Sequence, residues 1–254
     1  MGLGPLRGDR LEPARPGHPG SARHMRRGEL PMRAAGATVQ VVFQDNHLIA
    51  VNKPPGLICQ PDGSEAKPVG TLVQEWLKVT LQKPGNVYLA SIHRLDKPVS
   101  GTLLFAKTTK AAQRMSLAFK NRDVSKKYLA LVHGQVHQAG GTIAGSADMG
   151  ESDLHWRFLR LPSRASLPSS SSSFSLIEVS IASGKKHQIR RQLAVGLSPI
   201  VGDVLFGGKP IFSASPHDRE ENDMIFLHAH TLEFSHPVSR EKTRIESLPR
   251  WLIS

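Results

Sequence analysis

The sequence predicts an α+β fold with a mixed, mostly antiparallel central sheet and flanking helices. Two observations lead to this prediction. Short β-branched runs recur along the chain, several of them joined by connections of hairpin length, and segments with helical apolar spacing lie between them. With 254 residues and 39% hydrophobic content, the chain is long enough for one sizeable core and too short for two large domains.

The folded domain is predicted to occupy residues 37–254, and a disordered leader is predicted over residues 1–36. The leader is rich in Gly, Pro and Arg and has no apolar periodicity. An Arg-rich N-terminus is typical of organellar transit peptides. Three acidic residues and many prolines argue against a transit peptide, so a flexible leader without a targeting role is at least as well supported.

Within the domain, alternating and continuous apolar runs predict strands, and apolar spacing of three or four residues predicts helices. We expect strands over residues 38–43, 47–52, 87–92, 101–107, 127–134, 153–160, 176–182 and 225–234. We expect helices over residues 70–81, 108–121 and 186–197. Residues 163–173 are rich in serine and are predicted to form a solvated loop.

Charge and cysteine content restrict the class of protein. The formal net charge is +12 and the isoelectric point is about 10.2, which predicts a polyanionic partner such as nucleic acid. The single cysteine, Cys59, excludes an intramolecular disulfide and a cysteine-rich zinc site. No apolar run approaches the roughly 20 residues that cross a bilayer, so we expect an intracellular protein that binds no membrane. The sequence does not distinguish a cytoplasmic protein from one located in a mitochondrion or a plastid.

The densest group of ionisable residues lies in the segment SIHRLDKPVSG, residues 91–101, between two predicted strands. Loops held by rigid strands often carry catalytic residues. An aspartate in such a loop, taken alone, is more often a cap, a turn former or half of a salt bridge. The segment therefore needs support from other parts of the chain.

That support comes from five further motifs in order along the chain. The HRLD segment with its following Ser-Gly resembles the catalytic loop of the RluA branch of the RNA pseudouridine synthases, and the other motifs resemble that family too. They are N-K-P-x-G-L at residues 52–57, K-x-Y-x-A followed by Gly134, G-K-x-H-Q-I-R at residues 184–190, P-I-x-G-D at residues 199–203, and L-H-A at residues 227–229. The matches extend from about residue 39 to residue 237. The resemblance implies the pseudouridine synthase catalytic fold.

The resemblance implies isomerisation of uridine in RNA, in which the N1–C1′ bond breaks and C5 bonds to C1′. It assigns the catalytic carboxylate to Asp96, which either attacks C1′ or removes a sugar proton. A carboxylate enclosed under a stacked base loses hydration, so it needs a fixed cation, and Arg190 is the candidate because a guanidinium can bind a carboxylate through two nitrogens. Tyr128 is the candidate aromatic face for the flipped base. The reaction is redox-neutral, so no cofactor and no metal are expected.

RNA is the expected partner, whether ribosomal, transfer or messenger RNA, and a monomer is expected. By resemblance, Arg94 enters the space that the flipped nucleotide leaves. The other predicted RNA contacts form a basic group: Lys126, Lys127, Lys185, Lys186 and His187. His228 and His230 would share a face of a strand and could bind zinc together, but no zinc site is expected, because no third ligand is suggested nearby and the L-H-A motif already accounts for one histidine.

Two positions depart from the family pattern. Val99 stands where the loop usually has threonine, and Phe206 stands where tyrosine is frequent. Many relatives carry an N-terminal S4 RNA-binding module, and no such module is expected here. The alternative reading is a catalytically inactive RNA-binding or ribosome-assembly factor with the same fold.

Overall fold

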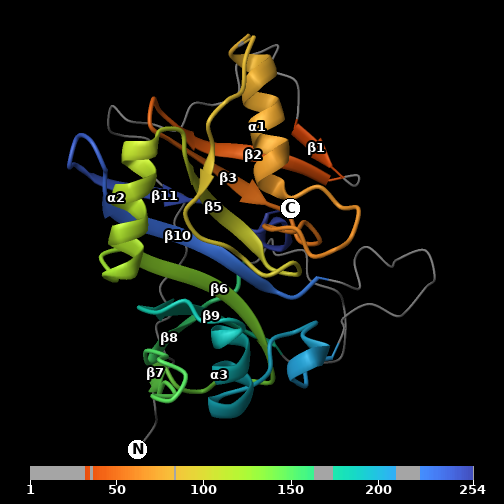
Figure 1. Ribbon diagram of the computed structural model, residues 1–254. Helices are drawn as coiled ribbons and strands as arrows, with labels where there is room; N and C mark the ends of the chain where they lie inside the picture. Colours follow the sequence, from red (N-terminus) through yellow and green to blue (C-terminus); the bar gives the residue numbers. More distant parts are fainter. Residues whose placement is uncertain (1–31, 35–36, 83, 163–173, 210–223, 254) are drawn as a thin grey trace, which may run out of the picture. The chain divides into compact units, whose positions relative to one another are not determined.

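The computed structural model describes residues 32–34, 37–82, 84–162, 174–209 and 224–253 (Figure 1). The described chain forms two compact units. We call them the Asp96 unit, which runs to Lys126 and also contains His228–Ser247, and the Arg190 unit, which contains Lys127–Leu227 and the residues from Leu248 onward. One catalytic domain over residues 37–254 stays a prediction. No described helix is long and apolar enough to cross a membrane.

The Asp96 unit is built on a mixed sheet with strand order β1-β2-β3-β5-β10. β11 pairs with β10 and β4 pairs with β5, and every pairing in this unit is antiparallel except that of β5 with β10. The strands are β1 (Met32–Ala34), β2 (Ala37–Gln44), β3 (Leu48–Lys53), β4 (Ala90–Ser91), β5 (Ser100–Ala106), β10 (Leu227–Ser235) and β11 (Lys242–Glu246). β1 lies within the predicted leader, whose other residues are outside the described ones.

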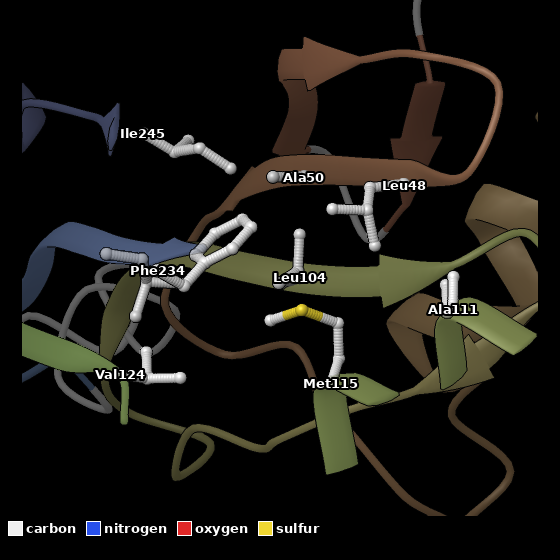
Figure 2. Close-up of a cluster of buried hydrophobic side chains, with 10 residues drawn as sticks. Leu48, Ala50, Leu104, Ala111, Met115, Val124, Phe234 and Ile245 are labelled. Atoms are coloured by element: carbon white, nitrogen blue, oxygen red, sulfur yellow. The ribbon is translucent and has the colours of Figure 1, made fainter. Parts of the chain in front are cut away.

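Two helices belong to this unit, α1 (Val69–Thr80) and α2 (Thr109–Lys120). α2 begins where the Thr108 side chain accepts a hydrogen bond from the Ala111 N–H, which satisfies one of the free amides of the first turn. Its apolar face joins a core made with β3, β5, β10 and β11. Figure 2 shows that core, formed by Leu48, Ala50, Leu104, Ala106, Ala111, Met115, Val124, Leu232, Phe234 and Ile245.

The Arg190 unit contains an antiparallel sheet with strand order β6-β9-β8-β7. Its strands are β6 (Ser125–His133), which enters the unit at Lys127, β7 (Gly140–Ile143), β8 (Leu154–Leu159) and β9 (Phe174–Ile181). The helix α3 (Gln188–Gly196) and two short 3₁₀ turns, η1 (Val204–Phe206) and η2 (Arg250–Leu252), complete the unit.

The predicted fold class is confirmed, and all three predicted helices are present within two residues of their expected bounds. The predicted strand over residues 87–92 is reduced to the two residues of β4. After Ser91 the regular ladder stops, and the Leu104 N–H donates to the His93 ring nitrogen Nε2, at 3.0 Å. Three short strands, β1, β7 and β11, were not predicted. The predicted serine-rich loop over residues 163–173 lies outside the described residues.

Candidate active site

Asp96 lies in the connection from β4 to β5, held between two buried neighbours. Leu95 and Val99 on either side of it are buried, and Val99 is only 3% exposed. The Val99 N–H donates to the Asp96 carbonyl at 3.0 Å, closing a turn over the two intervening residues. Asp96 itself is half-buried at the surface of this turn. Because the Val99 side chain is enclosed, valine in place of threonine suits its surroundings.

Lys53 holds the far side of the same turn. Its side chain is 0% exposed, and Nζ donates to the carbonyls of Pro54, Leu57 and Lys97 at 3.0, 2.9 and 3.1 Å. The Gly56 N–H also donates to the Lys97 carbonyl, at 2.9 Å. Burial lowers the pKa of Lys53 to about 8, against the opposing effects of the Cys59 thiol and the Asp96 carboxylate. The N-K-P-x-G-L motif thus supports the Asp96 turn from a distant part of the chain.

The segment after this motif contacts the residues before Asp96. The Leu95 N–H donates to Cys59 Sγ at 3.4 Å. Burial raises the pKa of Cys59, so the sulfur is a neutral thiol that accepts this bond. The exposed Arg94 donates from Nη1 to Gln60 Oε1 at 3.2 Å. Arg94 is therefore at the surface beside Asp96, where the resemblance requires it to meet RNA.

His93, the first residue of the HRLD motif, supports the loop from inside. Its ring stacks on Phe119 of α2, with centroids 5.0 Å apart and an interplanar angle of 16°. Burial, aided by the charge of Lys126, lowers the pKa of His93 to about 3. The ring is therefore neutral at physiological pH, and Nε2 accepts the Leu104 amide bond described above. This arrangement makes His93 a structural residue.

A buried polar network follows Asp96 along β5. Ser100 Oγ lies 2.8 Å from His228 Nδ1, and His228 Nε2 lies 3.1 Å from the Ser247 carbonyl. His230 Nδ1 lies 2.7 Å from the same carbonyl. Burial lowers the pKa of His228 to about 3. Among the described residues, no group of three or more His, Cys, Asp or Glu side chains is placed to hold a metal ion.

Gly101 explains why the loop motif ends in Ser-Gly. Its φ is +124°, and a Cβ at this position would lie 2.4 Å from both the backbone nitrogen and the backbone oxygen of Ala229. Gly101 and Ala229 are partners in the parallel pairing of β5 with β10. A side chain would therefore push apart the two strands that carry the HRLD and L-H-A motifs.

In the Arg190 unit, Tyr128 and α3 lie on the same face of the sheet. Tyr128, Val179 and Trp156 are partners across β6, β9 and β8, so they share a face. Ile143 of β7 is on that face too, because it is two residues from the partner of Trp156. A Cβ on Gly196 of α3 would lie 2.5 Å from Ile143 Cγ2, which places the helix over this face. Tyr128 is half-buried.

Arg190 is buried in the first turn of α3 and forms a two-pronged ion pair. It is 6% exposed, and its Nε and Nη2 donate to Asp203 Oδ2 and Oδ1, both at 2.7 Å. The guanidinium carbon lies 5.1 Å from the centroid of the Phe206 ring. The sequence predicts that the two-pronged partner of Arg190 is the catalytic carboxylate, but Asp203 occupies that edge. In the sequence, Asp203 stands out only as the last residue of the P-I-x-G-D motif.

The predicted RNA contacts differ in exposure. Lys185 and Lys186 are exposed just before α3, whereas Lys126 is 8% exposed. Burial and then the charge of Arg122 lower the pKa of Lys126 to about 8. Lys127 lies on the sheet face opposite Tyr128, since it is the adjacent residue of β6, and its Nζ is 3.4 Å from Glu178 Oε1.

His187 precedes α3 in a left-handed conformation, with φ of 57°, and packs edge-on against the Phe206 ring at a centroid distance of 5.7 Å. Of the predicted catalytic residues, Tyr128 and Arg190 therefore belong to one unit, where the helix that carries Arg190 lies over the sheet face that carries Tyr128. Asp96 belongs to the other unit.

The chain was then compared with known families. The model of the family described as RNA pseudouridylate synthase matches residues 47–195. The chain belongs to this family. The matched residues include the Asp96 loop, Tyr128 and Arg190, so each candidate catalytic residue lies inside the region that defines an RNA pseudouridylate synthase.

Named relatives agree with this membership. The chain is 32% identical over 216 residues to the ribosomal large subunit pseudouridine synthase D of Xanthomonas campestris, covering 81% of this chain and 64% of that protein. It is 29% identical over 226 residues to the tRNA pseudouridine synthase C of Haemophilus ducreyi, covering 83% of this chain and 90% of that protein. The chain thus spans somewhat less than two thirds of the first relative's length.

Solved structures show the same fold. Human RNA pseudouridylate synthase domain containing 4 superposes with a TM-score of 0.63 at 22% identity, covering 84% of this chain and 90% of that one. Human RNA pseudouridylate synthase domain containing 1 gives a TM-score of 0.58 at 21% identity, covering 83% of each chain.

Proposed function

We propose that this protein isomerises specific uridines in RNA to pseudouridine, with Asp96 as the catalytic carboxylate. The observation that carries the proposal is the family match over residues 47–195, within which Asp96 stands in the HRLD loop. The contacts of this loop support the assignment. Lys53, Cys59 and His93 hold the backbone around Asp96 through buried or half-buried groups, a preorganisation that a catalytic side chain needs.

In the proposed reaction the N1–C1′ bond of the target uridine breaks and a C5–C1′ bond forms. The proton on C5 leaves and N1 ends protonated, so atoms and electrons balance without an oxidant, a reductant or a leaving group. Asp96 acts on the ribose side, either by attacking C1′ or by removing a sugar proton. Both routes need the ionised carboxylate, which is why a nearby guanidinium is part of the proposal.

Arg190 and Tyr128 are the proposed partners of Asp96. Arg190 supplies a positive charge that is already fixed by Asp203, and Tyr128 supplies a ring on which the flipped uracil stacks. Stacking of a flipped base on an aromatic ring is worth about 1–3 kcal/mol, which offsets part of the cost of unstacking. The phenol can also accept or relay the C5 proton.

The proposed RNA contacts are the exposed cations and the residues beside them. Arg94 enters the space that the nucleotide leaves, and Lys185, Lys186 and His187 contact phosphates near α3. Lys127 is proposed as a contact on the other face of the sheet. Lys126 is too enclosed for a surface phosphate contact, so we propose that it supports the loop through its position near His93.

The test uses RNA labelled with [5-³H]uridine, because formation of pseudouridine releases the label from C5. Total RNA from cells that lack the gene is incubated with the purified protein, and tritium release is measured. Pseudouridine mapping of total RNA with and without the gene then identifies the substrate. Release of tritium and loss of mapped sites on deletion support the proposal. RNA binding without either effect supports the inactive RNA-binding factor instead.

A further inference from the structure

We propose that Asp203 and Phe206 form a two-sided clamp that fixes the direction in which Arg190 presents its charge. The inference rests on the proposed function, because Arg190 serves there as the cation of the reaction. Asp203 is the last residue of the P-I-x-G-D motif, and Phe206 lies three residues after it. Both act through Arg190 and are therefore positioning residues.

Asp203 holds one edge of the guanidinium. Its two oxygens accept from Nε and Nη2, both at 2.7 Å, so the planar group cannot rotate in its own plane without breaking a bond. Asp203 is 1% exposed, which means that no solvent competes for these bonds. The pairing also balances the positive charge of a guanidinium that is buried.

Phe206 covers one face of the guanidinium. The distance of 5.1 Å from the Arg190 guanidinium carbon to the ring centroid lies within cation–π range. His187 packs edge-on against the same ring and restrains it from another side. Movement of Arg190 out of its plane toward Phe206 is therefore blocked by a side chain that is itself packed.

Both arms of the clamp come from one rigid turn. The Asp203 carbonyl accepts from the N–H groups of Phe206 and Gly208 at 3.0 and 2.8 Å, and the Asp203 N–H donates to the Ile200 carbonyl at 3.1 Å. Gly202 has φ of +84°, and a Cβ there would lie 2.5 Å from the Met224 carbonyl oxygen. The turn therefore fixes the spacing between the carboxylate and the ring.

Asp203 engages one defined edge of the Arg190 guanidinium. It accepts from Nε and from one position on Nη2, so Nη1 and the other side of Nη2 face away from the Asp203 carboxylate. Asp203 therefore fixes the direction in which the guanidinium presents its positive charge. In the proposed function that charge serves the reaction, so Asp203 would influence the rate through Arg190.

The neighbouring residue provides a matched control. Arg191, the next residue of α3, pairs with Glu151, whose side chain is buried. Glu151→Gln thus weakens an arginine–carboxylate pair on the same helix without touching Arg190. The test compares Asp203→Asn, Phe206→Leu, Phe206→Tyr and Glu151→Gln with the unmodified chain. Single-turnover tritium release is measured over a series of protein concentrations on RNA labelled with [5-³H]uridine.

We expect Asp203→Asn and Phe206→Leu to lower the maximal rate about 10-fold or more, while the protein concentration at half-maximal rate changes less than about threefold. Phe206→Tyr keeps a ring over Arg190, so its maximal rate stays within about threefold. The control variant Glu151→Gln is also expected to keep the maximal rate of the unmodified chain. Equal rate losses in Glu151→Gln and Asp203→Asn, or a loss confined to half-saturation, would overturn the clamp.

A second measurement does not depend on activity. In ¹⁵N spectra the Arg190 Nε–H signal, identified by its absence in Arg190→Lys, is expected to exchange slowly with solvent in the unmodified chain. It is expected to exchange faster in Asp203→Asn. A rapidly exchanging signal in the unmodified chain would contradict the clamp even if the protein is active. Slow exchange in a protein that releases no tritium would keep the clamp and refute the proposed function.

Discussion

Lys53 brings a charged side chain into the interior of the Asp96 unit to hold backbone carbonyls. All three of its protons are donated to carbonyl oxygens, one of them in the residue after Asp96. The interaction therefore joins the end of β3 to the loop that carries Asp96. At the scale of single residues, this lysine, the neutral His93 ring and the Cys59 thiol form the support of Asp96.

We expect Lys53→Met to destabilise the protein by about 1–3 kcal/mol, because three buried or half-buried hydrogen bonds to backbone carbonyls are lost. The loss is measured as the free energy of unfolding in denaturant, followed by the fluorescence of Trp76 in a chain whose other two tryptophans are replaced by phenylalanine. Lys67→Met is the matched control, since Lys67 is exposed and forms an exposed pair with Glu75. Equal stability of the two variants would contradict the role given to Lys53.

The sequence identified Asp96, Tyr128 and Arg190 as candidates through motifs, and it could not identify their supports. In the sequence, Lys53 appears only as the second residue of the N-K-P-x-G-L motif. Nothing in the pattern of neighbouring residues shows that the Lys53 side chain is buried. Asp203 was hidden for a similar reason: it follows Arg190 by 13 positions, and only the turn that brings η1 to α3 makes the two a pair.

At the scale of elements, different interactions hold the candidate site residues of the Asp96 unit and those of the Arg190 unit. In the Asp96 unit the close approach of β5 and β10 at Gly101 and the network of Ser100, His228 and Ser247 hold the start of β5. In the Arg190 unit the face of the sheet that carries Tyr128 is the face covered by α3. Strand periodicity predicted neither arrangement, because register and helix placement depend on tertiary contacts.

The same limit explains two of the three strands that the sequence did not predict, β7 and β11. β7 contains two adjacent glycines and β11 contains a single aliphatic residue, Ile245, among charged and polar ones. Their pairing with β8 and β10 supplies the regularity that their composition lacks.

The buried histidines of β10 and of the HRLD loop make the stability of the Asp96 unit sensitive to acid. The pKa values of His93 and His228 are about 3 in the folded protein against an ordinary value of 6.5. Between these values the unfolded chain binds protons that the folded chain does not, so stability rises with pH from about 3 to 6.5 and is lost as pH falls through that range. Each of these two histidines therefore lowers the free energy of unfolding by about 2 kcal/mol when the pH falls from 7 to 5.

His228→Asn is therefore expected to reduce the difference in unfolding free energy between pH 7 and pH 5 by about 2 kcal/mol, although the variant is less stable at pH 7. Denaturant unfolding at the two pH values, again followed by Trp76, measures this. The exposed His137→Asn serves as the control and should leave the difference unchanged. An unaltered difference in His228→Asn would show that His228 is not the titrating group.

At the scale of the whole molecule, the proposal assigns long-range attraction for RNA to the net charge of +12 and the chemistry to the motifs. The structure separates cations that the sequence could only group together. Lys185 and Lys186 are exposed, Lys127 pairs with Glu178, and Lys126 is buried, so the basic group is not one continuous surface.

Lys185→Ala with Lys186→Ala is expected to weaken RNA binding and to reduce the slope of log affinity against log salt by about 1–2, since each lost phosphate contact contributes about 0.7–0.9. Filter binding from low to moderate salt gives the slope. The exposed pair Lys67→Ala with Lys78→Ala changes the net charge equally and should change the slope less. The same slope change in both double variants would mean that only the total charge matters.

The most direct test of the whole account is single-turnover tritium release from RNA labelled with [5-³H]uridine, comparing Asp96→Asn with Asp148→Asn. Asp96→Asn keeps the shape of the side chain and removes its charge, so we expect release to fall to background while RNA affinity stays within about threefold. The exposed Asp148→Asn should match the unmodified chain. Release by Asp96→Asn at the unmodified rate would contradict the assignment of Asp96 as the catalytic carboxylate.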